Sequence, residues 1–103
     1  MSSPALFDPL SLPCGAVLPN RLAKAAMEEN MAETNQLPGK ALLNLYRQWA
    51  QGGTGLLITG NVMIDGSAMT GPGGVVLEQG SDLGPFRDWA QAGKSHSGQL
   101  WMQ

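Results

Sequence analysis

The strongest fold signal in this chain is the stretch TGLLITGNVMI at residues 54–64. Its centre, Leu56-Leu57-Ile58, is an uninterrupted apolar run that is followed by Thr59 and Gly60. A strand with one face in water alternates apolar and polar residues, and this run does not. We therefore expect both faces of the segment to be covered, which is typical of a parallel strand in an α/β protein.

The residues before this strand predict a helix that begins after Pro38-Gly39. Its apolar residues recur at i, i+3, i+4 and i+7, the spacing of a helix with one apolar face. They are Leu42, Leu45, Tyr46 and Trp49. Gly52-Gly53 is a stop signal for this helix. A helix, a two-glycine stop and a strand covered on both faces form one α/β unit.

Functional groups of parallel sheets collect beyond the C-terminal ends of the strands. Here that end is Thr59-Gly60-Asn61. A glycine at this place allows a flat ligand to approach the backbone closely, and the Asn61 amide offers both a donor and an acceptor. A simple strand-to-loop turn is the alternative, and the local sequence by itself favours it.

The composition is that of a globular protein, because 43% of the 103 residues are hydrophobic and 14% are charged. That length normally indicates one domain. The net charge is −2 and no Lys/Arg cluster exists, so nothing favours binding to nucleic acid or to an anionic membrane. No apolar run approaches the roughly 20 residues that span a bilayer. No secretory signal is recognisable, so we expect a cytoplasmic location.

The chain has one cysteine, Cys14, and one histidine, His96. An intramolecular disulfide or a zinc site made of several Cys and His residues is therefore excluded. The glycines of Gly53-Thr54-Gly55 do not form a dinucleotide-binding fingerprint, because Ile58 occupies the place of the third glycine. The sequence predicts no metal site.

The N-terminal part predicts a small hairpin over residues 4–20, turning near Pro13-Cys14-Gly15. Residues 21–27 predict the first strand of the main sheet, with a helix as the alternative because of the alanines. Lys24 is expected at a strand edge or with its amino group reaching water. The alternative is a buried lysine, which needs a charge partner or must lose its proton. Glu28 and Glu29 are expected to be solvated charges of an acidic loop, with acid/base chemistry by the paired glutamates as the alternative.

A long connection from Asp65 to Gly80 follows, interrupted by a short edge strand at residues 75–77. Ser81-Asp82 predicts the start of a second helix. Its inward residues are expected to be Leu83, Phe86, Trp89 and Ala90. A third apolar segment begins at residue 100 and the chain ends at Gln103. The order of strands and helices is typical of the opening of a larger α/β domain.

Three segments together resemble the old yellow enzyme type of flavin oxidoreductase, also called the NADH:flavin oxidoreductase family. LFDPL at residues 6–10 and LPNRLAKAAM at residues 18–27 are similar to its N-terminal hairpin and first barrel strand. GTGLLITGN at 53–61 looks like the second strand, and GQLWMQ at 98–103 looks like the third. The segments occur in the right order and spacing and cover essentially the whole chain.

The resemblance implies an α/β fold, the N-terminal part of a (β/α)8 TIM barrel truncated after about three strands, with an N-terminal hairpin. One partial FMN-binding barrel domain then spans residues 1–103, with the hairpin at 4–20 and the first β/α units at 21–103. Enzymes of this type reduce FMN with NAD(P)H and pass hydride to an activated alkene such as an enone.

The resemblance places FMN at the C-terminal face of the strands. The cofactor-binding residues that it implies are Ala25, Ala26, Met27, Glu28, Asn61 and Gln103. Gln103 would hydrogen-bond the pyrimidine edge of the flavin, and Asn61 stands where the family usually has a small residue. No catalytic residue is implied within this chain.

Two features depart from the family pattern. Glu28 stands where a hydroxyl or thiol commonly bonds the flavin, and a carboxylate there opposes flavin reduction unless it is protonated or turned away. The family's substrate-holding histidine pair or His/Asn pair, its tyrosine proton donor and its phosphate-binding loops would lie beyond Gln103. We therefore expect this chain alone to be inactive.

A second hypothesis is a non-catalytic module that binds a partner or oligomerises. Unpaired strand edges are a physical route to such association. As an enzyme, the protein is expected to take a small alkene or enone substrate, to bind neither nucleic acid nor membrane, and to self-associate through exposed barrel edges.

Overall fold

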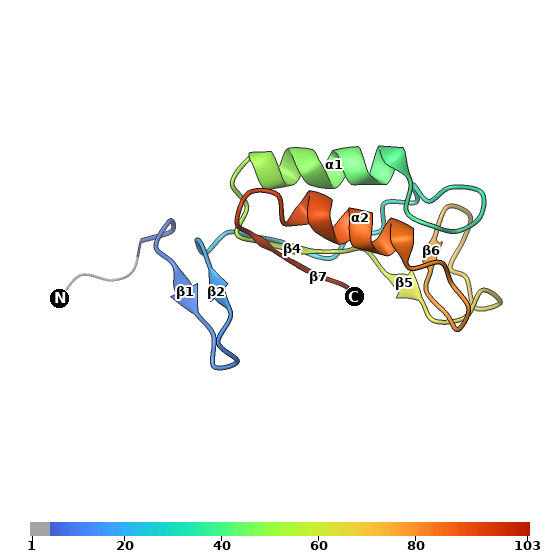
Figure 1. Cartoon of the computed structure of the whole chain (residues 1–103), viewed down its shortest axis with the longest axis horizontal. Helices are drawn as coiled ribbons and strands as arrows, with labels where there is room; N and C mark the ends of the chain where they lie inside the picture. The colour runs from blue at the N-terminus through green and yellow to red at the C-terminus, as the bar shows by residue number, and fades with distance from the viewer. Residues whose placement is uncertain (1–4) are drawn as a thin grey trace.

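Two helices lie on one face of a three-stranded parallel sheet in the computed structural model, which describes residues 5–103 (Figure 1). The elements in chain order are β1 (Leu10–Ser11), β2 (Val17–Leu18), β3 (Ala23–Lys24), α1 (Lys40–Gln51), β4 (Leu56–Ile58), β5 (Val62–Met63), β6 (Val75–Val76), α2 (Gly84–Gly93) and β7 (Gln99–Trp101). The predicted α/β class with parallel strands is confirmed.

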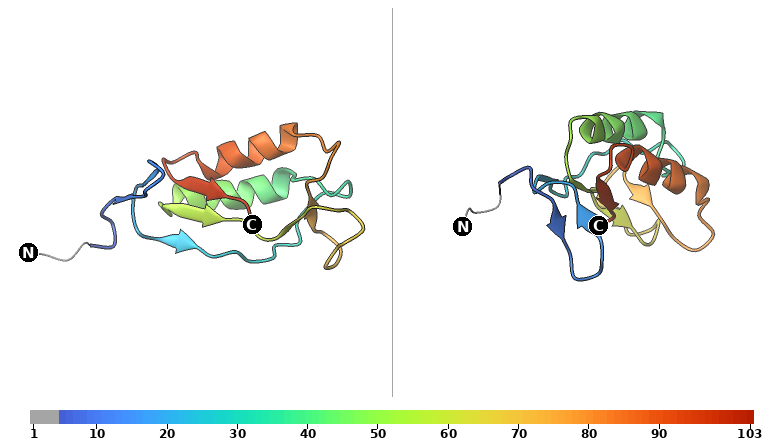
Figure 2. Two further views of the ribbon diagram at one scale, coloured as in Figure 1. Left: turned by 90° about the horizontal axis from the view of Figure 1, so that it is seen from below. Right: turned by 60° about the vertical axis from the view of Figure 1, so that its left-hand side comes forward.

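The central strand of the sheet is β4, which pairs in parallel with β3 on one side and β7 on the other. Leu57 lies opposite Lys24 in one neighbour and Leu100 in the other. Figure 2 shows the three strands side by side with α1 and α2 covering one face. Since side chains alternate along a strand, Leu57 faces the helices and Ile58 faces away from them.

Burial of the apolar stripe of α1 explains why these residues form a helix here. Leu42, Tyr46 and Ala50 are buried, and they pack with Leu57 and with Phe86 and Trp89 of α2. The helix ends as predicted: the Gly52 N–H bonds the Gln48 carbonyl oxygen, and Gly53 adopts a φ of 93°. That conformation is accessible to glycine at little cost.

Helix α2 begins later and is packed differently from the prediction. Asp82 accepts a hydrogen bond from the Gly84 N–H at its start. Phe86 and Trp89 are buried as expected, but Leu83 precedes the helix and is 49% exposed, so its predicted inward position is wrong. Ala92 supplies the next buried position instead.

Outside the main sheet, β1 and β2 pair antiparallel with Leu10 opposite Leu18. Strand β6, at the place of the predicted strand 75–77, pairs in parallel with β5. Strand β5 lies at residues 62–63, inside the stretch 54–64, and the sequence pattern does not predict it as a separate strand. The first strand of the main sheet is shorter than predicted, since β3 covers residues 23–24 of the expected 21–27.

Within residues 5–103, no helix is both long enough and apolar enough to cross a membrane. The same residues contain no group of three or more Cys, His, Asp or Glu side chains arranged to hold a metal ion.

Candidate functional site

The C-terminal ends of β4 and β7 are joined by backbone hydrogen bonds. The Thr59 N–H donates to the Trp101 carbonyl oxygen at 2.9 Å, and the Val62 N–H donates to that of Gln103 at 3.0 Å. The Gln103 N–H in turn donates to the Thr59 hydroxyl oxygen at 3.1 Å. Gln103 is therefore held beside the segment 59–62, which contains Asn61.

The chain that follows β3 closes on the same strand end. A Cβ on Gly60 would overlap the Met27 carbonyl oxygen and a carboxylate oxygen of Glu29. Gly60 itself is buried. The missing side chain thus makes room for the protein's own backbone, and the close approach of a flat ligand at Gly60 stays a prediction.

Most of the six predicted cofactor-binding residues are solvent-exposed at this end of the sheet. Ala25, Ala26, Glu28 and Gln103 are exposed, Met27 is 52% exposed, and Asn61 is half-buried. The structure brings Met27, Asn61 and Gln103 around Gly60, while the two alanines continue directly from β3.

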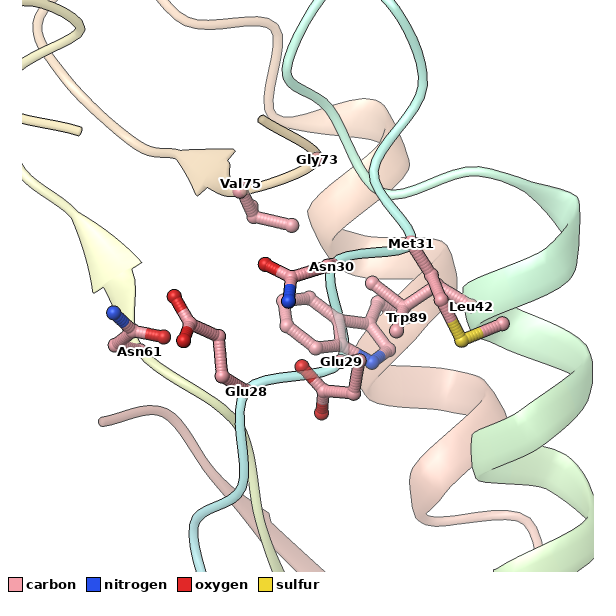
Figure 3. Close-up of a pocket in the computed structure, with 10 residues that line it drawn as sticks. Glu28, Glu29, Asn30, Met31, Leu42, Asn61, Gly73, Val75 and Trp89 are labelled. Atoms are coloured by element: carbon pink, nitrogen blue, oxygen red, sulfur yellow. The ribbon is translucent and has the colours of Figure 1, made fainter. Parts of the chain in front are cut away.

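Glu28 and Asn61 also line a cavity of about 10 Å³ and point toward each other in Figure 3. Trp89 lines it from the other side, and its buried Nε1 has no hydrogen-bond partner among the described residues. A cavity of about this size has room for roughly one water molecule. A flavin ring cannot enter it, so any flavin must lie on the exposed side of these residues.

The Glu28 carboxylate is held by the long connection between β5 and β6. Thr70 Oγ1 donates a hydrogen bond to Glu28 Oε1 at 2.5 Å. This contact joins residues 42 positions apart in the sequence. The acidic side chain is thereby fixed toward residues 65–74.

Lys24 and Glu29 form a buried ion pair, so the predictions that the Lys24 amino group reaches water and that Glu29 is a solvated charge are wrong. Their side chains are only 8% and 11% exposed, and Lys24 Nζ lies 3.8 Å from Glu29 Oε2. Lys24 Nζ also donates to the Ile58 carbonyl oxygen at 2.5 Å and to the Tyr46 hydroxyl at 3.2 Å. The same amino group lies 5.3 Å and 5.1 Å from the ring centroids of Tyr46 and Trp49.

Glu29 is the acceptor that joins this ion pair to β4 and α1. Its Oε2 accepts hydrogen bonds from the Tyr46 hydroxyl and, at 3.2 Å, from the Gly60 N–H. We refer to Lys24, Glu29 and Tyr46 as the polar triad. One signal for it was present in the sequence: Lys24 interrupts an apolar strand, and a buried lysine requires a charge partner.

Burial shifts the pKa values of two members of the polar triad, Lys24 and Tyr46. Burial lowers the pKa of Lys24, although the Glu29 carboxylate partly opposes that change. Burial and the hydrogen bond to Glu29 raise the pKa of Tyr46 far above its ordinary value. The Tyr46 hydroxyl therefore stays protonated near neutral pH and remains a donor to the carboxylate.

The exposed side of this strand end fits the edge of a flavin ring. Asn61 and Gln103 carry amides that supply donors and acceptors for a polar rim. Ala25 and Ala26 are small and Met27 is apolar, so a flat ring can approach the chain closely there. This donor set contains no feature that excludes a flavin.

Sequence comparison identifies curated relatives, although no protein-family model matches the chain. It is 54% identical over 57 residues to the NADH-dependent flavin oxidoreductase iliE of Neonectria sp. (strain DH2). It is 35% identical over 102 residues to the NADH-dependent flavin oxidoreductase iccE of Talaromyces variabilis. These matches cover 55% and 95% of this chain, but only 7% and 25% of the two relatives.

Structure comparison agrees with the sequence comparison. The old yellow enzyme homologue from Zymomonas mobilis superposes with a TM-score of 0.84 at 22% identity, covering 97% of this chain and 27% of that one. Morphinone reductase superposes with a TM-score of 0.85 at 24% identity, covering 99% and 26%. At these identities the superpositions show a shared fold. In sequence and in fold, this chain resembles the NADH-dependent flavin oxidoreductases of the old yellow enzyme family, and it spans a quarter or less of the curated relatives' length.

Proposed function

We propose that this chain forms one edge of the FMN site in an NAD(P)H-dependent oxidoreductase of the old yellow enzyme type. The observation that carries the proposal is the convergence of Met27, Asn61 and Gln103 at the exposed C-terminal end of β3, β4 and β7. Ligands of parallel α/β folds gather at this end of the strands.

In this proposal the residues bind and orient the cofactor. The Gln103 side-chain amide bonds the pyrimidine edge, while Ala25, Ala26 and Met27 contact the ring, with Asn61 near its rim. Bound FMN supplies the hydride chemistry, from NAD(P)H to an activated alkene such as an enone. The relatives' names support NADH and a flavin for those proteins.

In this proposal, the Glu28 carboxylate points away from the reactive part of the flavin. A carboxylate next to the ring opposes flavin reduction, because the reduced flavin gains negative charge. The hydrogen bond from Thr70 supports an orientation in which Glu28 is directed toward the β5–β6 connection. We infer that Thr70 keeps this charge away from the reactive part of the ring.

Association without catalysis is a second candidate function. Met27, Trp101 and Met102 are 52%, 43% and 45% exposed. Such exposed apolar side chains favour contact with another protein surface. Self-association, an enone substrate and a cytoplasmic location stay predictions.

The test of the flavin proposal uses a chimera. In it, the quarter of the Talaromyces variabilis relative that matches this chain is replaced by this chain. We expect the purified chimera to contain flavin, with Gln103→Ala weakening flavin binding about 2- to 13-fold, the equivalent of one hydrogen bond of about 0.5–1.5 kcal/mol. Absorbance and fluorescence titration measure the affinity.

Gln99→Ala is the matched control, because Gln99 opens β7 at its N-terminal end. Four residues at about 3.3 Å each place Gln103 roughly 13 Å further along the chain. We expect the Gln99 variant to keep native affinity. A folded chimera without flavin, or loss of flavin in the Gln99 variant alone, contradicts the assigned site.

A further inference from the structure

We propose that the polar triad of Lys24, Glu29 and Tyr46 positions the cofactor edge, by holding the Gly60 peptide against the chain at Met27–Glu28. This inference rests on the proposed function. The triad residues would not touch the flavin. They would act through the backbone that carries Met27, Asn61 and Gln103.

The first step of the argument is connectivity. The triad joins four parts of the chain: Lys24 lies in β3, Glu29 in the segment after it, Tyr46 in α1, and the acceptor carbonyl of Ile58 in β4. No other charged side chain among the described residues is hydrogen-bonded to the end of β4. A buried network with satisfied partners specifies one geometry and rigidifies the structure around it.

The second step is proximity to the proposed site. Glu29 directly follows Glu28, and the Gly60 N–H that it binds directly precedes Asn61. Each anchoring contact is therefore one residue away from a predicted cofactor-binding residue. A change in the Glu29–Gly60 hydrogen bond must alter the spacing between the two segments that would line the ring.

The third step is the side of the sheet on which the triad lies. Lys24 is in register with Leu57, and both lie on the face that α1 and α2 cover. The proposed cofactor residues are exposed at the strand ends instead. The triad is thus shielded from a bound ligand, as expected of positioning residues and not of catalytic ones.

The fourth step concerns the ionised form of Glu29. A carboxylate only accepts hydrogen bonds, so Glu29 Oε2 can serve the Tyr46 hydroxyl and the Gly60 N–H while its charge compensates Lys24. A glutamine would present an N–H2 group and leave Lys24 without its counter-charge. Breaking one side of a buried ion pair is strongly destabilising, whereas replacing both partners by apolar residues is often tolerated.

The experiment separates positioning from general stability with the double variant Lys24→Met/Glu29→Leu. Removing both charges leaves no uncompensated buried charge, so we expect this variant to stay folded with a modestly lowered melting temperature. Gly60 nevertheless loses its acceptor. We expect its amide to exchange with deuterium at least about tenfold faster, equivalent to about 1.4 kcal/mol of lost protection. Hydrogen exchange of peptides that contain residue 60, measured by mass spectrometry, gives the readout.

Two further variants keep the test decisive if the double variant unfolds. Tyr46→Phe removes one hydroxyl and should raise Gly60 exchange to a smaller extent. Glu33→Gln is the matched control, because Glu33 belongs to the same connecting segment but is exposed. In the Glu33→Gln variant, the Gly60 amide should exchange with deuterium at the rate of the native chain. Native Gly60 exchange in a folded double variant overturns the inference; if the double variant unfolds, native Gly60 exchange in Tyr46→Phe overturns it.

The chimera distinguishes this inference from the proposed function. In the chimera, the double variant should lose flavin affinity about tenfold while the flavin-free protein stays folded and still unfolds cooperatively. Native affinity in the double variant overturns the positioning role and leaves the flavin site standing. A native chimera that folds without flavin overturns the proposed function, and the hydrogen exchange result then decides separately whether the triad fixes the strand end.

Discussion

The two faces of the β3-β4-β7 sheet have opposite environments. On one face, Leu57 is fully buried and Leu100 packs against the core formed by α1 and α2. On the other, Ile58 is half-buried and Trp101 is 43% exposed. These residues alternate along the same two strands. The difference shows that the helix-covered face carries the packed core, while the side chains on the other face of these strands are more exposed in this chain.

The largest expected difference between the faces concerns Leu57 and Trp101. Leu57→Ala removes a buried side chain and leaves a cavity between the sheet and the helices, which should cost about 2–5 kcal/mol of unfolding free energy. Trp101→Ala removes a partly exposed side chain and should cost far less. Urea unfolding followed by circular dichroism, at several protein concentrations, measures both. Similar losses in the two variants would contradict the comparison.

The exposed face also makes a prediction about association. Trp101 and Met102 are close to half exposed, so we expect the 103-residue chain to self-associate. Trp101→Ser/Met102→Ser should shift sedimentation velocity profiles toward the monomer. The native circular dichroism spectrum should be kept. A native chain that is already monomeric throughout the micromolar range would show that this face does not drive association.

The next largest difference in stability is expected between two glycine substitutions, at Gly60 at the end of β4 and at Gly71 in the β5–β6 connection. A Cβ on Gly60 would overlap the Met27 carbonyl oxygen, whereas a Cβ on Gly71 meets no atom within 4 Å. We expect Gly60→Ala to cost about 1–3 kcal/mol, since backbone must move to make room. Gly71→Ala should change the unfolding free energy by less than about 0.5 kcal/mol. Thermal unfolding of both variants distinguishes them.

Much of the helix-covered face could be predicted from the sequence. The apolar run at residues 56–58 and the 3.6-residue spacing of Leu42 and Tyr46 depend on local periodicity, which the sequence displays directly. Leu83 was assigned inward because it fits the same spacing, but it precedes the first turn of α2. Spacing identifies an apolar stripe well and the helix boundary less well.

The sequence indicates that a buried Lys24 would need a charge partner, but the partners in the polar triad could not be predicted, because they are contacts between distant residues. Lys24 meets Tyr46 across 22 positions and Ile58 across 34. Local sequence favoured an exposed Lys24 and a solvated Glu29, since most such residues are exposed. At the strand end, the family resemblance implies Asn61 and Gln103, and the structure adds that Gly60 accommodates the Met27 backbone. Their binding to a flavin stays a prediction.

The stability of the chain should also depend on alkaline pH, because Tyr46 is buried at the helix-covered face of the sheet. Its pKa is raised above the ordinary 10.0, so the unfolded chain loses this proton at a pH where the folded chain keeps it. Stability should therefore fall as the pH rises above 10. The lowered pKa of Lys24 has the opposite effect on stability. It makes the free energy of unfolding rise with pH, but only up to pH 10.5, the ordinary pKa of a lysine. Above pH 10.5, the decrease in stability that is due to Tyr46 remains.

Tyr46→Phe tests this difference, since the chain has a single tyrosine. The variant should lose the alkaline decline that is due to the phenol. Tyrosinate absorbance in the native chain should appear together with unfolding and not before it. Ionisation of Tyr46 in a chain that is still folded would show that its hydroxyl is accessible to solvent, in contradiction to its buried position.

The smallest expected effect lies in the exposed β5–β6 connection, the opposite environment to Tyr46. The Asp65 carboxylate accepts hydrogen bonds from the Ser67 N–H at 2.9 Å and the Ser67 hydroxyl at 2.8 Å. These bonds lower its pKa below the ordinary 3.8, the backbone bond contributing most. Their contribution to stability is therefore present above pH 3.8 and lost as the pH falls through the lowered pKa. Ser67→Ala removes the hydroxyl and keeps the backbone donor, so the pKa of Asp65 should rise but stay below 3.8. An NMR titration of the Asp65 side chain measures it. A pKa that reaches 3.8 would show that the backbone bond depends on the hydroxyl, and an unchanged pKa would show that solvent already satisfies this exposed carboxylate.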